Sequence, residues 1–503
     1  MNSTLKVKSN ISGFRVEKIP KRVLPYDTTS ICPDCYFIDK KVTVIPAQLS
    51  EKDNSVIMTK TCKKHGKFTD IIWSDVSLWR KSHNFFYKSI GIKNPERRTV
   101  NGCPLDCGLC DKHSSHTALG LIDVTLRCNL NCPICFADAN QNPPDDPSQE
   151  DVESWLIKLR SNLPIPTPGI QFAGGEPTIC ENLPLYIQKA KELGFNHIMI
   201  ATNGIKLASD PKIVNQLVKA GLNTVYLQFD GLTAKPYIMA RGKDIREIKD
   251  KAIDNCKKAG LDGVILVPTI VRGINDDQLG DIINYALARR DIVKCINFQP
   301  VSFTGRINQD EKNNMRITIP DVIHGINKQM KGLIEPEDWY PISSMLILGR
   351  AIGLMQGEPY LELSAHPECG MATFLVFDKA GKPTPITKII NMQHFIKVLE
   401  YVCNLYAYNK PLARVRSKLK IVQEIWRMKE RGIISELISN LLSRGDYDSL
   451  AGFMGNVIML GMMHFMDPYN LDLERVKYCD IHYATQNGLI PFCTQNIIHR
   501  FIS

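Results

Sequence analysis

Short apolar segments alternate with amphipathic segments through residues 119–301, and this alternation constrains the fold more than any other feature of the chain. The apolar segments are Leu119–Leu126, Gly169–Ala173, His197–Ala201, Thr224–Phe229, Gly263–Ile270 and Cys295–Gln299. Helical periodicity occurs between them in Asp151–Leu163, Leu183–Leu193, Pro211–Ala220, Asp244–Ala259 and Asp277–Ala288. About six strand–helix repeats predict a parallel sheet with helices outside. Such a barrel-like fold places its chemistry at the carboxyl ends of the strands.

The alternation stops on both sides of this region, and 503 residues exceed one ordinary core. We therefore predict an α/β protein with three domains. Residues 1–118 form a cysteine-rich metal-binding domain with a small β-ribbon, and residues 119–305 form a partial (β/α)6 barrel. Residues 306–503 form a mainly helical domain, with a hairpin at Phe374–Thr387.

Three cysteines follow the first predicted strand directly. Cys128, Cys132 and Cys135 have the spacing Cys-x3-Cys-x2-Cys. Three thiolates in one compact loop suit a cubane iron–sulfur cluster and leave its fourth iron without a protein ligand. The competing interpretation is a structural zinc site, which would need a fourth ligand close by.

Polar residues and glycines follow the other strands, as expected for a site at the strand ends. They are Gly174, Gly175, Glu176, Thr202, Asn203, Gln228, Asp230, Arg272, Gln299 and Val301. Together with the cysteine motif, they resemble the radical S-adenosylmethionine (SAM) superfamily. That resemblance implies a catalytic [4Fe-4S] cluster on the three cysteines, with SAM bound to the open iron and cleaved to a 5′-deoxyadenosyl radical. It also implies that Ile134 packs on adenine, that Gly174–Pro177 binds the SAM amino group, and that Arg272 pairs with the SAM carboxylate.

Two further groups of cysteines lie in the first 118 residues. Cys103, Cys107 and Cys110 repeat the catalytic spacing and predict an auxiliary cluster or another metal site. A second set resembles zinc ribbons and rubredoxin knuckles, which hold zinc or a single iron; its members are Cys32, Cys35, Cys62 and His65. Spacing alone does not exclude an exchange of ligands between the two groups.

Three distant cysteines, Cys369, Cys479 and Cys493, lie in loop-like segments rich in Gly and Pro. We expect them to converge on another auxiliary cluster.

Charge and hydropathy bear on location and partners. The net charge of +10 favours an acidic partner only weakly, because it is spread over a long chain. No signal peptide and no run of about 18 apolar residues is present, which predicts a cytoplasmic protein. Leu412–Arg431 is a basic amphipathic segment that could rest on a membrane's inner face, or simply cover the core.

The order of motifs also resembles the archaeal tetraether synthases. It runs Cys-x2-Cys, Cys-Lys-Lys-His-Gly, Gly-Cys-Pro-Leu-Asp-Cys-Gly-Leu-Cys and Arg-Cys-Asn-Leu-Asn-Cys-Pro-Ile-Cys-Phe-Ala. This resemblance implies the joining of terminal methyl carbons of isoprenoid chains in an archaeal diether phospholipid. It further implies auxiliary [4Fe-4S] clusters, a rubredoxin-like iron, a lipid-binding surface and an electron donor such as ferredoxin or flavodoxin.

Two alternatives remain open. The first is a radical SAM enzyme with auxiliary clusters that modifies a peptide or a cofactor. The second is a metal-stabilised nucleic-acid-binding protein, which the sparse aromatic residues near the basic stretches disfavour, so that we expect no nucleic-acid partner.

Overall fold

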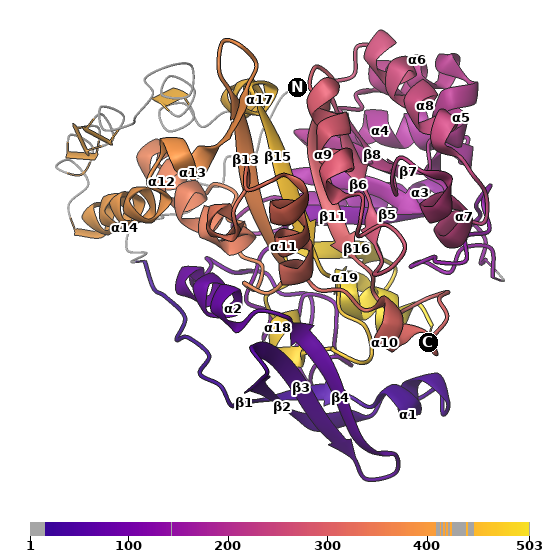
Figure 1. Cartoon of the computed structure of the whole chain (residues 1–503), viewed down its shortest axis with the longest axis vertical. Coiled ribbons are helices and arrows are strands. Elements are labelled where there is room, and N and C mark those ends of the chain that lie inside the picture. The colour runs from indigo at the N-terminus through magenta and orange to yellow at the C-terminus, as the bar shows by residue number, and fades with distance from the viewer. Residues whose placement is uncertain are drawn as a thin grey trace.

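Two β-sheets organise the chain in the computed structural model (Figure 1). The structure describes residues 16–141, 143–408 and 447–501, together with positions 413, 416, 417, 419, 420, 423, 424, 439 and 440. A four-stranded sheet lies at one end of the molecule, and a 13-stranded sheet runs through the rest. Most of the predicted amphipathic segment Leu412–Arg431 lies outside the described residues. Within the described residues, no helix is long and apolar enough to cross a membrane.

The N-terminal sheet is an antiparallel meander. Its strands are β1 (Tyr26–Ile31), β2 (Val44–Lys52), β3 (Ser55–Cys62) and β4 (Gly66–Trp73). Asp53 and Asn54 connect β2 to β3, both with φ near +50 to +60°, as a tight two-residue hairpin of this hand requires. Burial alternates along β3, so one face of the sheet packs inward. The short helices α1 (Pro33–Phe37) and α2 (Val76–Ser82) flank the sheet.

Six parallel strands form the centre of the large sheet, in chain order. They are β5 (Leu119–Thr125), β6 (Gly169–Gly174), β7 (His197–Thr202), β8 (Thr224–Gln228), β9 (Gly263–Val267) and β11 (Val293–Pro300). The intervening helices are α3 (Gln149–Arg160), α4 (Leu183–Glu192), α5 (Ile205–Ser209), α6 (Pro211–Ala220), α7 (Ala234–Arg241), α8 (Arg246–Lys258) and α9 (Leu279–Ala288). The predicted α/β fold with a partial (β/α)6 barrel is confirmed. A two-residue strand, β10 (Thr269–Ile270), pairs with β11.

The C-terminal region extends this sheet at both edges, which the sequence patterns did not reveal. β15 (Val457–Met463) lies parallel to β11, and β16 (Ile481–Thr485) lies parallel to β5. Antiparallel strands then continue outward; they are β12 (Tyr340–Pro341), β13 (Gly370–Phe377), β14 (Pro383–Pro385) and β17 (Gly488–Pro491). The pairing of β13 with β14 confirms the predicted hairpin.

Helices make up most of the regular structure after the barrel, as predicted. The longer ones are α11 (Ile319–Gln329), α12 (Leu346–Gln356), α14 (Met392–Tyr408) and α17 (Tyr447–Gly455). Single turns are α10 (Lys312–Met315), α13 (Ile386–Ile389), α18 (Leu473–Val476) and α19 (Phe492–Thr494). A buried core runs without interruption from β2 and β3 through the barrel to β13 and β15. The N-terminal sheet is therefore part of the body of the molecule.

A buried ion cluster also joins the parts of the chain. Arg316 lies between Asp467 (2.6 Å) and Asp70 (2.7 Å) on β4, and its side chain is 4% exposed. Replacing Arg316 by Met leaves Asp467 buried without its cation, which typically costs about 3–5 kcal/mol. We expect the free energy of unfolding of Arg316→Met to fall by that amount in urea denaturation.

Arg80→Met is the matched control, because Arg80 pairs with Glu51 at the surface. An exposed pair contributes about 0–1 kcal/mol. Equal losses for the two variants would contradict the role given to Arg316.

Candidate active site

The loop after β5 holds the three predicted cluster cysteines in a fixed turn. Asn140 accepts from the amide of Cys128 (2.7 Å) and donates to the carbonyls of Cys128 and Leu130 (3.0 Å each). The other end of the loop is fixed by Cys135, which exchanges two backbone hydrogen bonds of 2.9 Å with Arg306. Cys128, Cys132 and Cys135 are all half-buried. The loop is therefore ordered by the protein itself and leaves its thiols accessible.

These thiols line a cavity of about 370 Å³ inside the barrel. Its wall is mainly apolar and includes Phe465, Tyr483 and Phe492 from the C-terminal region. Eight of the residues predicted for cofactor binding also line it: Ile134, Gly174, Gly175, Thr202, Asn203, Gln228, Gln299 and Val301. The strand ends and the cysteine loop thus meet in one place, as the fold requires.

Gly174 and Gly175 let the loop after β6 lie against the cysteine loop. A Cβ on Gly174 would lie 2.0 Å from the carbonyl oxygen of Thr125, and Gly174 has φ of +122°. A Cβ on Gly175 would lie 2.2 Å from the carbonyl oxygen of Arg127. Only glycine fits both positions.

Glu176 and Asp230 lie behind the wall of the cavity. The carboxylate of Glu176 accepts from Thr202 Oγ1 (2.7 Å) and from the amide of Asn203 (2.8 Å), so it ties the β6 loop to the β7 loop. Its complete burial raises the pKa of Glu176. Asp230 is also fully buried and is occupied by an arginine.

That arginine, Arg241 at the end of α7, was missed by sequence reasoning. It binds both oxygens of Asp230 (2.7 and 2.8 Å), donates to the carbonyl of Ile134 (2.9 Å) and lines the cavity. The charge on Asp230 was a sign that a cation must lie nearby. Nothing in the pattern indicated which arginine it would be.

The predicted role of Arg272 is wrong. Its guanidinium pairs with Asp321 (3.3 Å) on α11 and donates to the carbonyl of Arg316 (2.9 Å), and its side chain is 46% exposed. The chain passes through β10 before reaching Arg272, which carries that side chain away from the cavity. Among the described residues, Arg241 rather than Arg272 lines the cavity.

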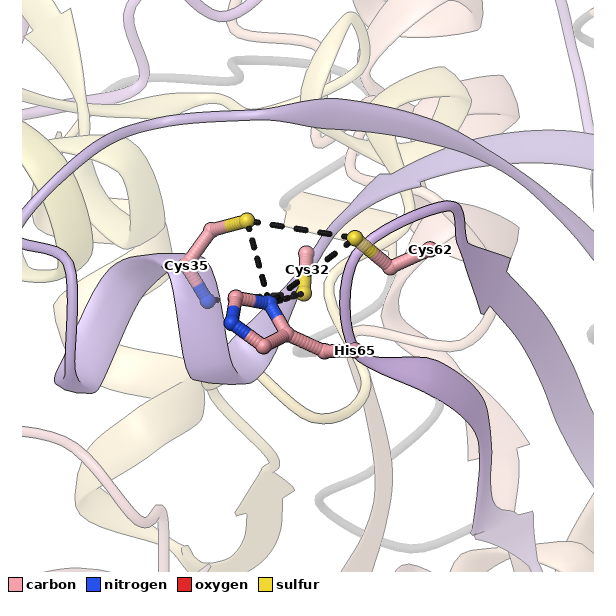
Figure 2. Close-up of side chains that lie close together, drawn as sticks. All are labelled: Cys32, Cys35, Cys62 and His65. Atoms are coloured by element: carbon pink, nitrogen blue, oxygen red, sulfur yellow. Dashed lines mark hydrogen bonds between the residues drawn. The ribbon is translucent and has the colours of Figure 1, made fainter.

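A second candidate metal centre lies in the N-terminal sheet (Figure 2). Cys32 and Cys35 flank the start of α1, while Cys62 and His65 come from the turn between β3 and β4. His65 Nδ1 lies 3.5 Å from Cys32 Sγ, 3.4 Å from Cys35 Sγ and 3.9 Å from Cys62 Sγ. His65 Nε2 faces Asp39 at 3.6 Å, which fixes the ring with Nδ1 toward the sulfurs.

The chemistry of this donor set fits one tetrahedral metal. Backbone amides of His65 and Lys64 lower the pKa of Cys62 to about 6, whereas burial raises that of Cys32 to about 12. Such amide–sulfur contacts stabilise a thiolate, and zinc binds thiolate and imidazole ligands together. Cys32, Cys35, Cys62 and His65 form one group of possible ligands, and neither Cys107 nor Cys110 belongs to that group.

Two family models and a long relative match this chain. Residues 122–286 match the radical SAM superfamily, and residues 24–74 match the HMPTM N-terminal zinc ribbon domain. A relative from Methanocaldococcus jannaschii, named 7,8-dihydro-6-hydroxymethylpterin dimethyltransferase, is 44% identical over 483 residues and is covered, like this chain, to 94%. The chain belongs to this family of radical SAM enzymes.

Other matches to this radical SAM enzyme are shorter. A probable GTP 3′,8-cyclase from Methanothermobacter marburgensis is 31% identical over 186 residues, which are 37% of this chain and 59% of the relative. Among solved structures, Streptococcus suis SuiB bound to the precursor peptide SuiA matches with a TM-score of 0.35 and 16% identity, over 44% of this chain and 46% of that one.

The name of the Methanocaldococcus relative contradicts the prediction of a tetraether synthase. It gives that relative a pterin to act on, so the predicted diether phospholipid partner and lipid-binding surface lose their support. It agrees instead with the alternative of a radical SAM enzyme that modifies a cofactor. The prediction rested on cysteine spacing, which indicates metal chemistry but not the substrate.

The radical SAM enzyme uses a [4Fe-4S] cluster and SAM, and the cysteine loop fits the cluster. Burial raises the pKa of Cys128 to about 11 and also raises that of Cys132. The free thiols of Cys128 and Cys132 would therefore be protonated at neutral pH. Coordination to iron would hold them as thiolates.

Cys103, Cys107 and Cys110 lie near one another and beside residues from the C-terminal end of the chain. Cys107 Sγ lies 3.3 Å from Thr494 Oγ1, and hydrogen bonding from Cys103 lowers the pKa of Cys107, with His499 contributing. The charges of Cys103 and Cys110 also interact. These contacts fit an additional metal site of the radical SAM enzyme.

Cys369, Cys479 and Cys493 converge as well. Cys493 is buried, and Cys369 and Cys479 are half-buried. The three thiols interact electrostatically, and burial is the main reason why the pKa of each is raised. Arg475 donates to Cys369 Sγ at 3.2 Å, so a cation faces this set. An anionic cluster would be stabilised there, which fits the predicted auxiliary centre.

Lys249 on α8 supports two residues of the cavity wall, Asn203 and Gln228, from outside the cavity. Its Nζ donates to the carbonyl of Asn203 (2.6 Å) and to Gln228 Oε1 (2.8 Å), and the side chain is 1% exposed. Removing a buried donor costs about 1–3 kcal/mol for each acceptor left unpaired. We expect Lys249→Met to bind SAM roughly tenfold or more weakly, measured by equilibrium dialysis of the reconstituted enzyme.

Lys257→Met, on the same helix but in an exposed pair with Asp291, is the control. Unchanged SAM affinity in Lys249→Met would refute the positioning role.

Proposed function

We propose that this radical SAM enzyme adds methyl groups to a reduced pterin of the kind named for its Methanocaldococcus relative. The observation that carries the proposal is the 44% identity over 94% of both chains, which spans the zinc ribbon, the barrel and the C-terminal strands. A cavity of about 370 Å³ within the barrel also falls in the usual range for small-molecule sites.

Each methylation replaces a carbon-bound hydrogen with a methyl group. By a radical route each methylation consumes two electrons from an external donor: one makes the 5′-deoxyadenosyl radical, which carries the hydrogen away as 5′-deoxyadenosine, and one completes the bond between the carbon radical and a methyl group that SAM gives as a cation equivalent. When bound, the [4Fe-4S] cluster supplies the electron that converts SAM to a 5′-deoxyadenosyl radical able to take hydrogen from carbon. An electron carrier such as ferredoxin or flavodoxin would supply that electron.

The residues of this chain bind and shield the reactants. Arg241 and Asp230 fix the backbone at Ile134, and Glu176 fixes the loops after β6 and β7. Phe136, Phe465 and Phe492 stack at one side of the cavity, with centroids of Phe465 and Phe492 4.1 Å apart. This apolar wall keeps water away from a reactive radical.

The test is anaerobic incubation of reconstituted enzyme with SAM, reductant and 7,8-dihydro-6-hydroxymethylpterin. We expect the pterin to stimulate formation of 5′-deoxyadenosine and to gain the mass of one or two methyl groups. Deoxyadenosine formation that does not respond to the pterin, with no methylated product, would reject the proposal.

A further inference from the structure

A small group of polar side chains lies inside the largely apolar cavity, below the strand ends. Tyr226 on β8 points into the barrel, and Asn297 and Gln299 point inward from β11. We call these three residues the Tyr226 cluster. Nothing in the cysteine chemistry or in the support of the strand-end loops uses it.

The hydrogen bonds within the cluster leave a definite set of groups unused. Tyr226 Oη accepts from Gln299 Nε2 at 2.8 Å and from Asn297 Nδ2. A phenol oxygen that accepts twice can still donate its own proton. Each amide donates one N–H to the phenol oxygen. Among the described residues, no group donates to Asn297 Oδ1 or Gln299 Oε1.

The cluster therefore offers the cavity one O–H donor and two carbonyl acceptors. Burial raises the pKa of Tyr226 above its usual value, so the phenol keeps its proton at neutral pH. Polar groups in an apolar cavity lose their water when a ligand enters, and they need partners on the ligand. A bound ligand should present two donors and one acceptor on one edge.

We propose that the Tyr226 cluster recognises the pyrimidine edge of the pterin, with Asn297 and Gln299 accepting from its amino group and ring N–H, and Tyr226 donating to its carbonyl. This inference rests on the proposed function and names the residues that select the substrate. The pterin edge carries two donors and one acceptor, which match in number the two acceptors and one donor of the cluster. The adenine of SAM, with one donor beside one acceptor, matches it less well.

The experiment compares Tyr226→Phe with wild type in the assay of pterin-dependent deoxyadenosine formation. Losing the hydroxyl removes one bond to the ligand and leaves two amide N–H groups unpaired. We expect the half-saturating pterin concentration to rise roughly tenfold or more. SAM affinity, measured in parallel by dialysis, should change less than the pterin response. Tyr285→Phe is the matched control, because its hydroxyl binds Asp250 (2.6 Å) outside the cavity.

A ligand series identifies the edge that is read. Wild type should prefer the 6-hydroxymethylpterin over the corresponding lumazine, in which a carbonyl replaces the amino group, by roughly tenfold or more. One of the two amides accepts from the amino group. Replacing that amide, by Gln299→Leu or by Asn297→Leu, should lower the ratio of pterin to lumazine affinity toward one. Iron content and absorbance show whether each variant still carries its clusters.

The outcomes separate this inference from the proposed function. If wild type does not respond to the pterin, the proposed function fails and the inference fails with it. If wild type uses the pterin and Tyr226→Phe saturates at the same concentration, only the inference is overturned. An equal loss of SAM and pterin affinity would also overturn it, because the cluster would then serve SAM.

Discussion

Cys132→Ala is expected to lose reductive cleavage of SAM by at least roughly 10³-fold, which corresponds to more than about 4 kcal/mol of activation free energy. Cys132 lies in the loop that brings three thiols to the cavity, so its loss leaves two ligands for a cluster that needs three. The variant should also lose one cluster's share of iron. Deoxyadenosine formation and iron content measure the two effects.

Two controls sharpen this prediction. Cys180→Ala removes a half-buried cysteine that belongs to none of the cysteine sets, and it should retain cleavage. Cys107→Ala disturbs the other Cys-x3-Cys-x2-Cys set, and it should lose iron but still cleave SAM without substrate. If Cys107→Ala abolished cleavage while Cys132→Ala retained it, the two sets would have to exchange roles.

Removing the metal held by Cys32, Cys35, Cys62 and His65 is expected to unfold the loops that carry them. The small core here consists of the three cysteines and Ile45, with Phe68 packed beside it, so the ligands are themselves the core. Structural zinc contributes apparent binding free energies of about 10–16 kcal/mol in isolated zinc fingers. Hydrogen exchange in peptides spanning residues 32–38 and 62–66 should accelerate by orders of magnitude in the chelated protein.

The ligand variants test the same site without a chelator. His65→Ala should lose the metal and its protection, whereas His65→Cys should keep both, because four thiolates also bind zinc or iron. Peptides from β6 and β7 serve as the internal reference. Unchanged exchange in the metal-free protein would mean that the packing of β2 and β3 on the main core holds these loops alone.

The central fold could be predicted because its signals are local. Each strand–helix repeat is a short segment with its own periodicity, and short connections make the order of the strands follow the order of the chain. Likewise, Cys32 and Cys35 reveal a metal site by spacing alone. β15 and β16 could not be found this way, because the Met-rich segment of β15 does not alternate and its pairing with β11 spans more than 150 residues.

The details of the site depend on contacts between distant residues. The sequence does not show which arginine, Arg241 or Arg272, lines the cavity. The structure shows that it is Arg241, whose guanidinium donates to the carbonyl of Ile134. Tyr226 lies two residues before Gln228 and so shares its face of the strand, a signal that could have been used. The substrate could not be predicted from the sequence, because the cavity wall is assembled from many strands and from the last part of the chain.

β15 and β16 come late in the chain, yet they pair with both edges of the parallel sheet. While the ribosome is still adding the final segments, β5 and β11 have free edges, and such edges attract other chains. Phe465, Tyr483 and Phe492 have also not yet arrived to close the wall beside the cysteine loop. Until these segments are in place, the cysteine loop lacks part of the apolar wall of its cavity, and the parallel sheet lacks its two outer pairings.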